Sequence, residues 1–259
     1  MQVHHPATAL CLTTDVRDEL ASIRIGYTDS STETEIPCTR LLISAGAWTP
    51  SVFSSLFPTS SITIPISSLA GHSLVVRVAA TASGSREEGQ GITASRGDGR
   101  HCHSVYCGTL DDGLSPELYE REDGVIYLAG VNSATMPLPR LATAAEPVEA
   151  SMDKLKDIAR RLIGEDLEVV RTGLCFRPIT PRGTPIITRI RDDQLGVVAR
   201  GDSEGRRPIK TRSGQEGGVF VAAGHGPWGI SLSLGTGKVL AEMMQERRLS
   251  ADVSQLGLS

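Results

Sequence analysis

The 259-residue sequence has no long hydrophobic run and no excess of basic residues. Its longest apolar stretches, such as residues 41–48 and 219–224, are far shorter than the roughly 20 residues that a membrane-spanning helix needs. The 26 Lys and Arg against 30 Asp and Glu give a net charge of -4, so the basic surface typical of nucleic-acid-binding proteins is missing. We therefore expect neither a membrane span nor a nucleic-acid partner.

Cysteine is scarce, and no leader pattern precedes the first strand-like segment. The five cysteines are an odd number without the dense, even spacing of a disulfide scaffold, which favours free thiols in a reducing compartment. Residues 1–15 contain no basic segment and only a short apolar patch at 9–12, unlike a signal peptide. We therefore expect a cytoplasmic protein. No metal site is expected, because no second ligand pair follows His101, Cys102, His103 and Cys107.

What the sequence does contain is typical of a folded globular protein, with 39% hydrophobic and 22% charged residues. Residues 21–27 and 40–44 are predicted strands, separated by a polar, turn-like stretch at 27–37. The continuous apolar run at 40–44 predicts a strand buried on both faces in a parallel sheet. Small residues at 45–47, after its carboxyl end, leave room for a ligand.

The middle of the chain has the pattern of an antiparallel sheet and one amphipathic helix. Strand-like pieces at 103–107 and 124–129 predict the sheet, and apolar residues at helical spacing predict a helix over 147–163, ended by Gly164. Prolines within 167–190 predict an interrupted strand, either at a sheet edge or over a cavity. Irregular loops are expected at 81–100 and 192–215.

A glycine-rich loop, GHGPWG at residues 224–229, matches the dinucleotide fingerprint GxGxxG between a predicted strand and a predicted helix. Only 30 residues follow Gly229, so no further strand and no ribose-binding acid can complete that unit. We therefore do not assign the loop to a pyrophosphate. Gly235 and Gly237 each cost the helix about 1 kcal/mol relative to alanine, which predicts close approach of either the sheet or a ligand. The N-H groups at the helix start suit an electron-rich group.

Four segments resemble, in the same order, the D-amino-acid oxidase and glycine oxidase type of FAD-dependent oxidoreductase, especially its fungal members. They are ISAGAWTP (43–50), SPELYEREDG (115–124), LCFRPITPRGTPII (174–187) and VFVAAGHGPWGISLSLGTGKVLAEM (219–243). The resemblance implies an α/β (mixed α+β) fold. Its expected parts are a partial, Rossmann-like FAD-binding domain at 1–58 and 173–259 and an antiparallel-sheet substrate-binding domain at 59–172. The family's N-terminal pyrophosphate fingerprint has no counterpart, so the first βαβ unit is predicted to be absent and the chain to be truncated at its N-terminus.

The resemblance also implies individual site residues. Arg177 matches the arginine that binds the substrate carboxylate, and the alternative is a surface ion pair. Cys175 is a candidate for a covalent link to the flavin, and the alternative is a buried, inert thiol. The expected FAD-binding residues are Ala45, Gly46, Trp48, Gly224, His225, Gly226, Trp228, Gly229 and Ile230.

The resulting hypothesis is oxidation of a small-molecule amine or amino acid by hydride transfer to flavin N5. One alternative is a truncated, non-catalytic remnant or interaction protein without bound FAD. Another is a nicotinamide-dependent dehydrogenase that uses the GHGPWG loop. The sequence does not indicate the substrate or the oligomeric state.

Overall fold

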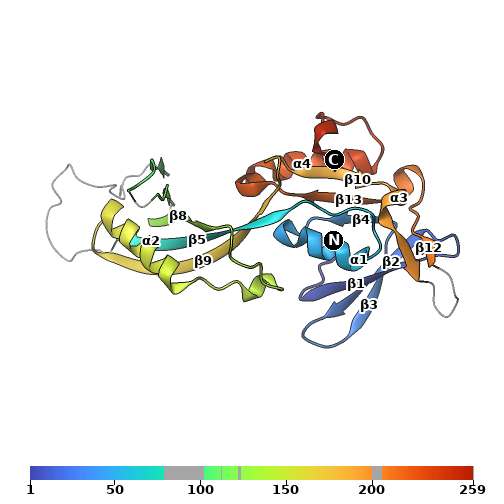
Figure 1. Ribbon diagram of the computed structural model, residues 1–259, viewed down its shortest axis with the longest axis horizontal. Helices are drawn as coiled ribbons and strands as arrows, with labels where there is room; N and C mark the ends of the chain where they lie inside the picture. Colours follow the sequence, from blue (N-terminus) through green and yellow to red (C-terminus); the bar gives the residue numbers. More distant parts are fainter. Residues whose placement is uncertain (79–101, 112, 122–123, 200–205, 259) are drawn as a thin grey trace. The chain divides into compact units, whose positions relative to one another are not determined.

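The chain folds into two compact units in the computed structural model, which describes residues 1–78, 102–111, 113–121, 124–199 and 206–258 (Figure 1). Unit 1 consists of Met1–Ser68 and Arg177–Ser259, and unit 2 of Leu69–Phe176. Strands β5 (Ser67–Val78) and β9 (Leu167–Ile179) each run from one unit into the other. The domain boundaries expected from sequence lie after residues 58 and 172. The loop expected at 81–100 and His101 lie outside the described residues.

Unit 1 contains a mixed sheet of three strands and a separate antiparallel sheet. The mixed sheet has the order β10 (Ile186–Ile190), β13 (Gly218–Ala223), β4 (Arg40–Ile43), in which β13 is antiparallel to β10 and parallel to β4. The antiparallel sheet is formed by β1 (Ala7–Thr14), β2 (Leu20–Tyr27) and β3 (Glu33–Pro37).

Strand β13 is buried along its whole length, because its alternating side chains enter two different cores. Val219 and Val221 belong to a core that also contains Phe53 of helix α1 (Thr49–Leu56). Phe220 and Ala222 face the opposite core, formed with the C-terminal half of helix α4 (Gly229–Met244). The central strand of unit 1 thus fixes the positions of both helices.

Two predictions for the N-terminal region are wrong. The stretch expected to be turn-like contains β3, which pairs with β2 because its Ile36 and Thr34 continue the alternating pattern of a strand. Strand β4 was expected to be buried on both faces, but only Ile43 is buried, and Leu42 is 39% exposed. Among the described residues β4 is an edge strand, so no neighbouring strand covers its other side and Leu42 stays exposed.

Unit 2 is built on a five-stranded sheet with the order β6 (Ser104–Tyr106), β7 (Glu117–Glu120), β8 (Val125–Ser133), β5, β9. Strands β5 to β8 pair in antiparallel fashion, as predicted. Strand β9 ends at Ile179, and β10 begins at Ile186 after a proline-containing turn. Both are edge strands, which confirms the prediction of an interrupted edge strand.

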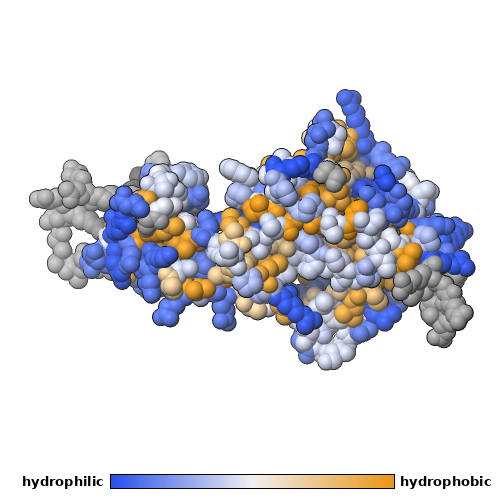
Figure 2. All heavy atoms as spheres, viewed as in Figure 1, coloured by the Kyte–Doolittle hydropathy of each residue, from blue (hydrophilic) through white to orange (hydrophobic). Residues whose placement is uncertain are grey.

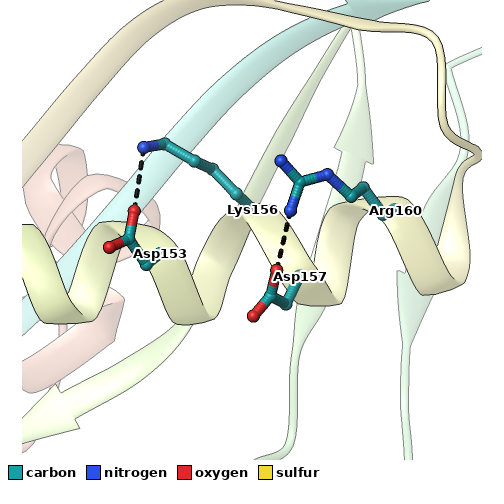
Figure 3. Close-up of polar contacts among 4 residues, drawn as sticks. All are labelled: Asp153, Lys156, Asp157 and Arg160. Carbon is teal, nitrogen blue, oxygen red and sulfur yellow. Dashed lines mark hydrogen bonds and ion pairs between the residues drawn. The ribbon is translucent and has the colours of Figure 1, made fainter.

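Helix α2 (Glu149–Leu162) covers one face of this sheet, close to the predicted range. Its apolar stripe of Met152, Leu155, Ile158 and Ala159 is buried in the core of unit 2. The opposite face carries two ion pairs, Asp153 with Lys156 at 3.0 Å and Asp157 with Arg160 at 2.8 Å (Figure 3). The buried apolar stripe therefore holds the helix against the sheet of unit 2.

The segment expected to be an irregular loop at 192–215 contains short regular elements instead, and its residues 200–205 lie outside the described part. These elements are α3 (Asp192–Leu195), β11 (Val197–Ala199) and β12 (Arg206–Pro208). The remaining 3-10 turns are η1 (Gly46–Trp48), η2 (Ala142–Ala144), η3 (Gly214–Glu216), η4 (Gly226–Trp228) and η5 (Ser254–Leu256). The mixed α/β class predicted from sequence is confirmed, and no described helix is both long and apolar enough to cross a bilayer.

Candidate functional site

Two strand-to-helix turns lie next to each other at one end of the sheet of unit 1. Strands β4 and β13 are parallel, and Ile43 pairs with Val221 near their carboxyl ends. Each strand is followed by a 3-10 turn and then by a helix, α1 after β4 and α4 after β13. In open α/β sheets, ligands bind outside the carboxyl ends of parallel strands, so this end of the sheet is the candidate site.

The first turn consists of Ser44, Ala45 and η1, and it contains three of the predicted FAD-binding residues. The Ala45 N-H donates to Thr49 Oγ1 at 3.1 Å, and Thr49 is fully buried, which fixes the turn to the start of α1. Gly46 adopts a φ of +55°, and a Cβ at this position would meet nothing within 4 Å. The Trp48 N-H donates to the Ala45 carbonyl at 3.0 Å. The turn therefore presents backbone with open space beside Gly46.

The second turn, GHGPWG, depends on two glycines with positive φ. Gly224 has a φ of +84°, and a Cβ there would lie 2.4 Å from Thr180 Cγ2. Gly226 has a φ of +56°, and the nearest atom to its virtual Cβ is Ile179 Cδ1 at 3.6 Å. The first glycine is thus required by packing against the chain after β9. The second is favoured by its positive φ alone, because a Cβ there would make only an ordinary contact with Ile179.

His225 lies half-buried between these glycines. Its Nε2 is 3.0 Å from Thr236 Oγ1, a contact that depends on the tautomer of the ring. Burial lowers the pKa of His225, which keeps the imidazole neutral at neutral pH. Thr236 is a residue that the sequence analysis missed. Thr236 lies inside α4, 11 residues along the chain from His225, and this spacing gives no signal in the sequence alone.

The start of α4 is open to solvent. Trp228 is 63% exposed and Ile230 is 93% exposed, and Gly229 is exposed as well. Trp228 is therefore not a core residue of the described chain. The close approach expected at Gly235 and Gly237 does not occur within the described residues, since a Cβ on either would meet nothing within 4 Å.

Arg177 lies on β9, two residues before the point where this strand reaches the glycine loop. Ile179 forms an isolated antiparallel bridge with His225, and its side chain points towards Gly226. Because side chains two residues apart lie on the same face of a strand, Arg177 lies on the loop-facing side of β9. It is half-buried, so it is not a fully exposed surface residue.

Cys175 belongs to unit 2. Its thiol is exposed and donates to the Gly71 carbonyl of the neighbouring strand at 3.5 Å. The alternative of a buried thiol is therefore wrong.

The two turns place backbone at adjacent helix starts, where N-H groups can receive an electron-rich group, and a Cβ at Gly46 would meet nothing within 4 Å. They do not constitute a complete dinucleotide site, because no glycine-rich pyrophosphate turn follows a first strand among the described residues.

Comparisons with known proteins give a consistent result. The sequence model of the family described as FAD dependent oxidoreductase (DAO) matches residues 7–243. A protein of Schizosaccharomyces pombe named as an oxidoreductase is 27% identical over 236 residues, which are 89% of this chain and 47% of that protein.

Solved structures share the fold. Glycine oxidase from Geobacillus kaustophilus has a TM-score of 0.59 at 17% identity, covering 98% of this chain and 52% of that one. L-proline dehydrogenase from P. horikoshii has a TM-score of 0.57 at 13% identity, covering 97% and 52%. The chain spans about half the length of these relatives. The family match covers most of the chain, and the chain belongs to the DAO family of FAD dependent oxidoreductases.

Proposed function

We propose that this protein takes part in the FAD-dependent oxidation of a small-molecule amine or amino acid. Unit 1 would hold part of the flavin, and unit 2 would serve as the substrate-binding domain. The observation that carries the proposal is the pair of adjacent strand-to-helix turns after β4 and β13. Further support comes from the relatives named for glycine and L-proline, two amino acids.

The flavin, when bound, supplies the acceptor for a hydride. The turn at Ala45, Gly46 and Trp48 and the loop from Gly224 to Ile230 would lie against the flavin and orient it. His225, neutral because burial lowers its pKa, would offer a polar contact without adding a charge.

Arg177 would bind the carboxylate of an amino-acid substrate. Its guanidinium presents parallel N-H donors that match the two oxygens of a carboxylate, a geometry that a lysine ammonium lacks. The proposal thus assigns orientation of the substrate to Arg177. Denaturation of the flavin-loaded chain tests whether Cys175 attaches the flavin covalently. Flavin that stays bound to the denatured chain would support the link, and release of the flavin would contradict it.

The test is titration of the purified chain with FAD, followed by quenching of flavin fluorescence. We expect saturable binding, weakened about tenfold in Trp228→Ala, since the loss of an aromatic contact worth about 1.4 kcal/mol changes affinity by that factor. The control Val16→Ala changes an exposed side chain on the β1–β2 turn and should bind FAD as the wild type does. If the protein is colourless and does not quench FAD, this chain by itself is not a flavoprotein.

A second measurement tests the substrate class. With a flavin-loaded protein, we expect Arg177→Lys to raise the KM for amino acids about tenfold or more, and to leave the KM for amines without a carboxylate unchanged. Equal effects on both substrate classes would contradict the role of Arg177. Quenching of NADH fluorescence in the absence of flavin would instead support a nicotinamide-dependent enzyme.

A further inference from the structure

The chain leaves helix α4 with a pair of arginines followed by a serine. Arg247 and Arg248 stand three and two residues before Ser250. The sequence has two other adjacent arginine pairs, at 160–161 and 206–207, and each has an isoleucine, not a hydroxyl residue, at the same spacing. Protein kinases select substrates partly by charge pattern, and those with an acidic substrate groove select serines that follow two arginines in this way.

The structure leaves this segment accessible. Arg247, Arg248 and Ser250 are exposed, and residues 247–253 lie in no helix or strand. Hydrophilic residues project from the surface at the top of Figure 2, where Figure 1 draws the chain after α4 in red. A kinase binds its substrate as an extended segment, so a stretch that already lies outside regular structure can enter the groove without unfolding a helix or a strand.

The segment is held to α4 by one carboxylate. Glu242 Oε2 accepts the Ser250 N-H at 2.7 Å, and the same carboxylate accepts the Ser250 hydroxyl. These hydrogen bonds lower the pKa of Glu242, which therefore carries its negative charge at neutral pH. The Glu242 side chain is only 16% exposed, which limits the screening of this charge by solvent.

The residues around Ser250 help to cover a hydrophobic core. Leu249, Val253 and Leu256 pack against the buried cluster formed by β10, β13 and the C-terminal half of α4. The Leu256 N-H donates to the Val253 carbonyl at 2.9 Å within the turn η5. We call residues 249–256 the covering segment. Its contact with Glu242 lies at its start, so a change at Ser250 acts where the segment leaves α4.

We propose that Ser250 is a phosphorylation site for a serine kinase that recognises Arg247 and Arg248, and that the phosphate displaces the covering segment from α4. In the reaction, the γ-phosphorus of ATP forms a bond with Ser250 Oγ, and its bond to the bridging oxygen of ADP breaks. ADP leaves with the electron pair of that bond, and the hydroxyl proton passes to a base of the kinase.

The displacement follows from the repulsion of like charges. Phosphorylation removes the hydroxyl donor that Glu242 accepts and places about -1.5 to -2 charges beside its carboxylate. The phosphate also lies near the C-terminal end of α4, where the last carbonyl groups carry partial negative charge. A phosphoserine next to an acidic residue or at a helix C-terminus disrupts the local structure. The bond between the Ser250 N-H and Glu242 is the first to be lost.

The first experiment incubates the purified full chain with ATP and the catalytic subunit of cyclic-AMP-dependent protein kinase, which selects arginines at these two positions. Mass spectrometry measures how much phosphate is incorporated and where. Ser250→Ala removes the acceptor, and Arg247→Ala combined with Arg248→Ala removes the recognition pair. Thr143→Ala is the matched control, because Thr143 is exposed and follows a single arginine, Arg140, by three residues. Circular dichroism checks that every variant is folded.

We expect one phosphate per chain, on Ser250, in the wild type and in Thr143→Ala, and loss of this phosphate in Ser250→Ala. The double arginine variant should lose about a hundredfold in kcat/KM, because each charged hydrogen-bonding partner contributes about tenfold. Incorporation that Ser250→Ala leaves undiminished would place the site elsewhere and overturn the proposal. So would a folded wild-type chain that takes up no phosphate while a peptide of residues 245–252 does.

A second experiment tests the displacement by hydrogen exchange of the phosphorylated and unmodified chains. We expect exchange in the covering segment to become at least about tenfold faster on phosphorylation. Glu242→Gln keeps an oxygen acceptor but removes the charge, so phosphorylation should accelerate exchange much less in this variant. Glu246→Gln, the matched control, changes a carboxylate that pairs with Arg189 and should respond as the wild type does.

Two results of this exchange experiment would overturn the displacement. One is exchange that phosphorylation leaves unchanged. The other is slower exchange, which would mean that the phosphate pairs with nearby cations such as Lys238 and holds the segment in place. Neither experiment involves flavin, so both are independent of the proposed oxidation.

Discussion

At the residue scale, the candidate site depends on glycines for two different reasons. Gly224 combines a positive φ with a neighbour that leaves no room for a side chain. Gly46 combines a positive φ with open space, and Gly226 combines one with an ordinary contact to Ile179. Only the first is required by the packing of this chain. The other two belong to the turns that would hold the flavin in the proposed function.

Substitution of Gly224 by alanine should destabilise the protein by about 2–4 kcal/mol, the sum of the left-handed backbone cost and overpacking against Thr180. Gly183→Ala is the matched control. Gly183 has a φ of +69° but nothing within 4 Å of its virtual Cβ, so this variant should lose only about 1 kcal/mol. Urea unfolding measures both free energies, and equal losses would contradict the packing role of Gly224.

A buried histidine in unit 2 should make stability depend on pH. His72 is 1% exposed, its Nε2 accepts the Val148 N-H at 3.3 Å, and burial lowers its pKa. The unfolded chain therefore takes up the proton at a higher pH than the folded protein does. The stability that neutral, buried His72 contributes is complete above about pH 6.5, the ordinary pKa of histidine. This contribution is lost as the pH falls below that value.

His72→Gln keeps an acceptor for the Val148 N-H but cannot titrate. We expect the free energy of unfolding to fall less between about pH 7.5 and about pH 5 in this variant than in the wild type. His5→Gln, at an exposed position, should keep the full loss. The role assigned to His72 fails if the wild type and His72→Gln lose the same free energy on acidification.

At the scale of elements, the buried stripe of α2 should matter far more than its surface charges. Leu155 is fully buried, so Leu155→Ala should cost about 2–5 kcal/mol. Asp157→Asn breaks an exposed ion pair with Arg160 and should cost less than about 0.5 kcal/mol. Thermal unfolding distinguishes the two variants. Comparable shifts in Tm would mean that the ion pairs, and not the apolar stripe, hold the helix.

Elements with a strong periodic pattern could be predicted from sequence, and those with weak patterns could not. Helix α2 and strand β13 have clear apolar patterns, and both lie where the sequence predicts them. Strand β3 was missed because its five residues are mostly exposed and polar, so nothing in their composition distinguishes them from a turn. Its pairing with β2 is decided by tertiary context.

The same distinction applies to the candidate site. The two turns were predicted from small residues and glycines, which have a local conformational meaning. The contact of His225 with Thr236 and that of Gly224 with Thr180 depend on where distant segments meet, which spacing along the chain does not reveal. The exposure of Leu42 was not predicted either, because an apolar strand looks the same in sequence whether or not a neighbour covers it.

At the scale of the whole molecule, the two units should unfold separately. Each has its own buried core, one containing Phe53 and the other Leu155. Scanning calorimetry should show two transitions. Phe53→Ala should lower the transition of unit 1 and Leu155→Ala that of unit 2, each by the several degrees that a core cavity causes. A single transition that both variants shift equally would show that the units unfold as one.

The parallel pairing of β4 with β13 also governs when the candidate site can form during synthesis. Ile43 is translated well before its partner Val221. All of unit 2 is translated between Ile43 and Val221. The contacts among its strands and α2 are local in sequence, so they can form before β13 is available to pair with β4. Until β13 has been made, β4 lacks the strand with which it pairs in the described fold, and this apolar strand is then a target for chaperones.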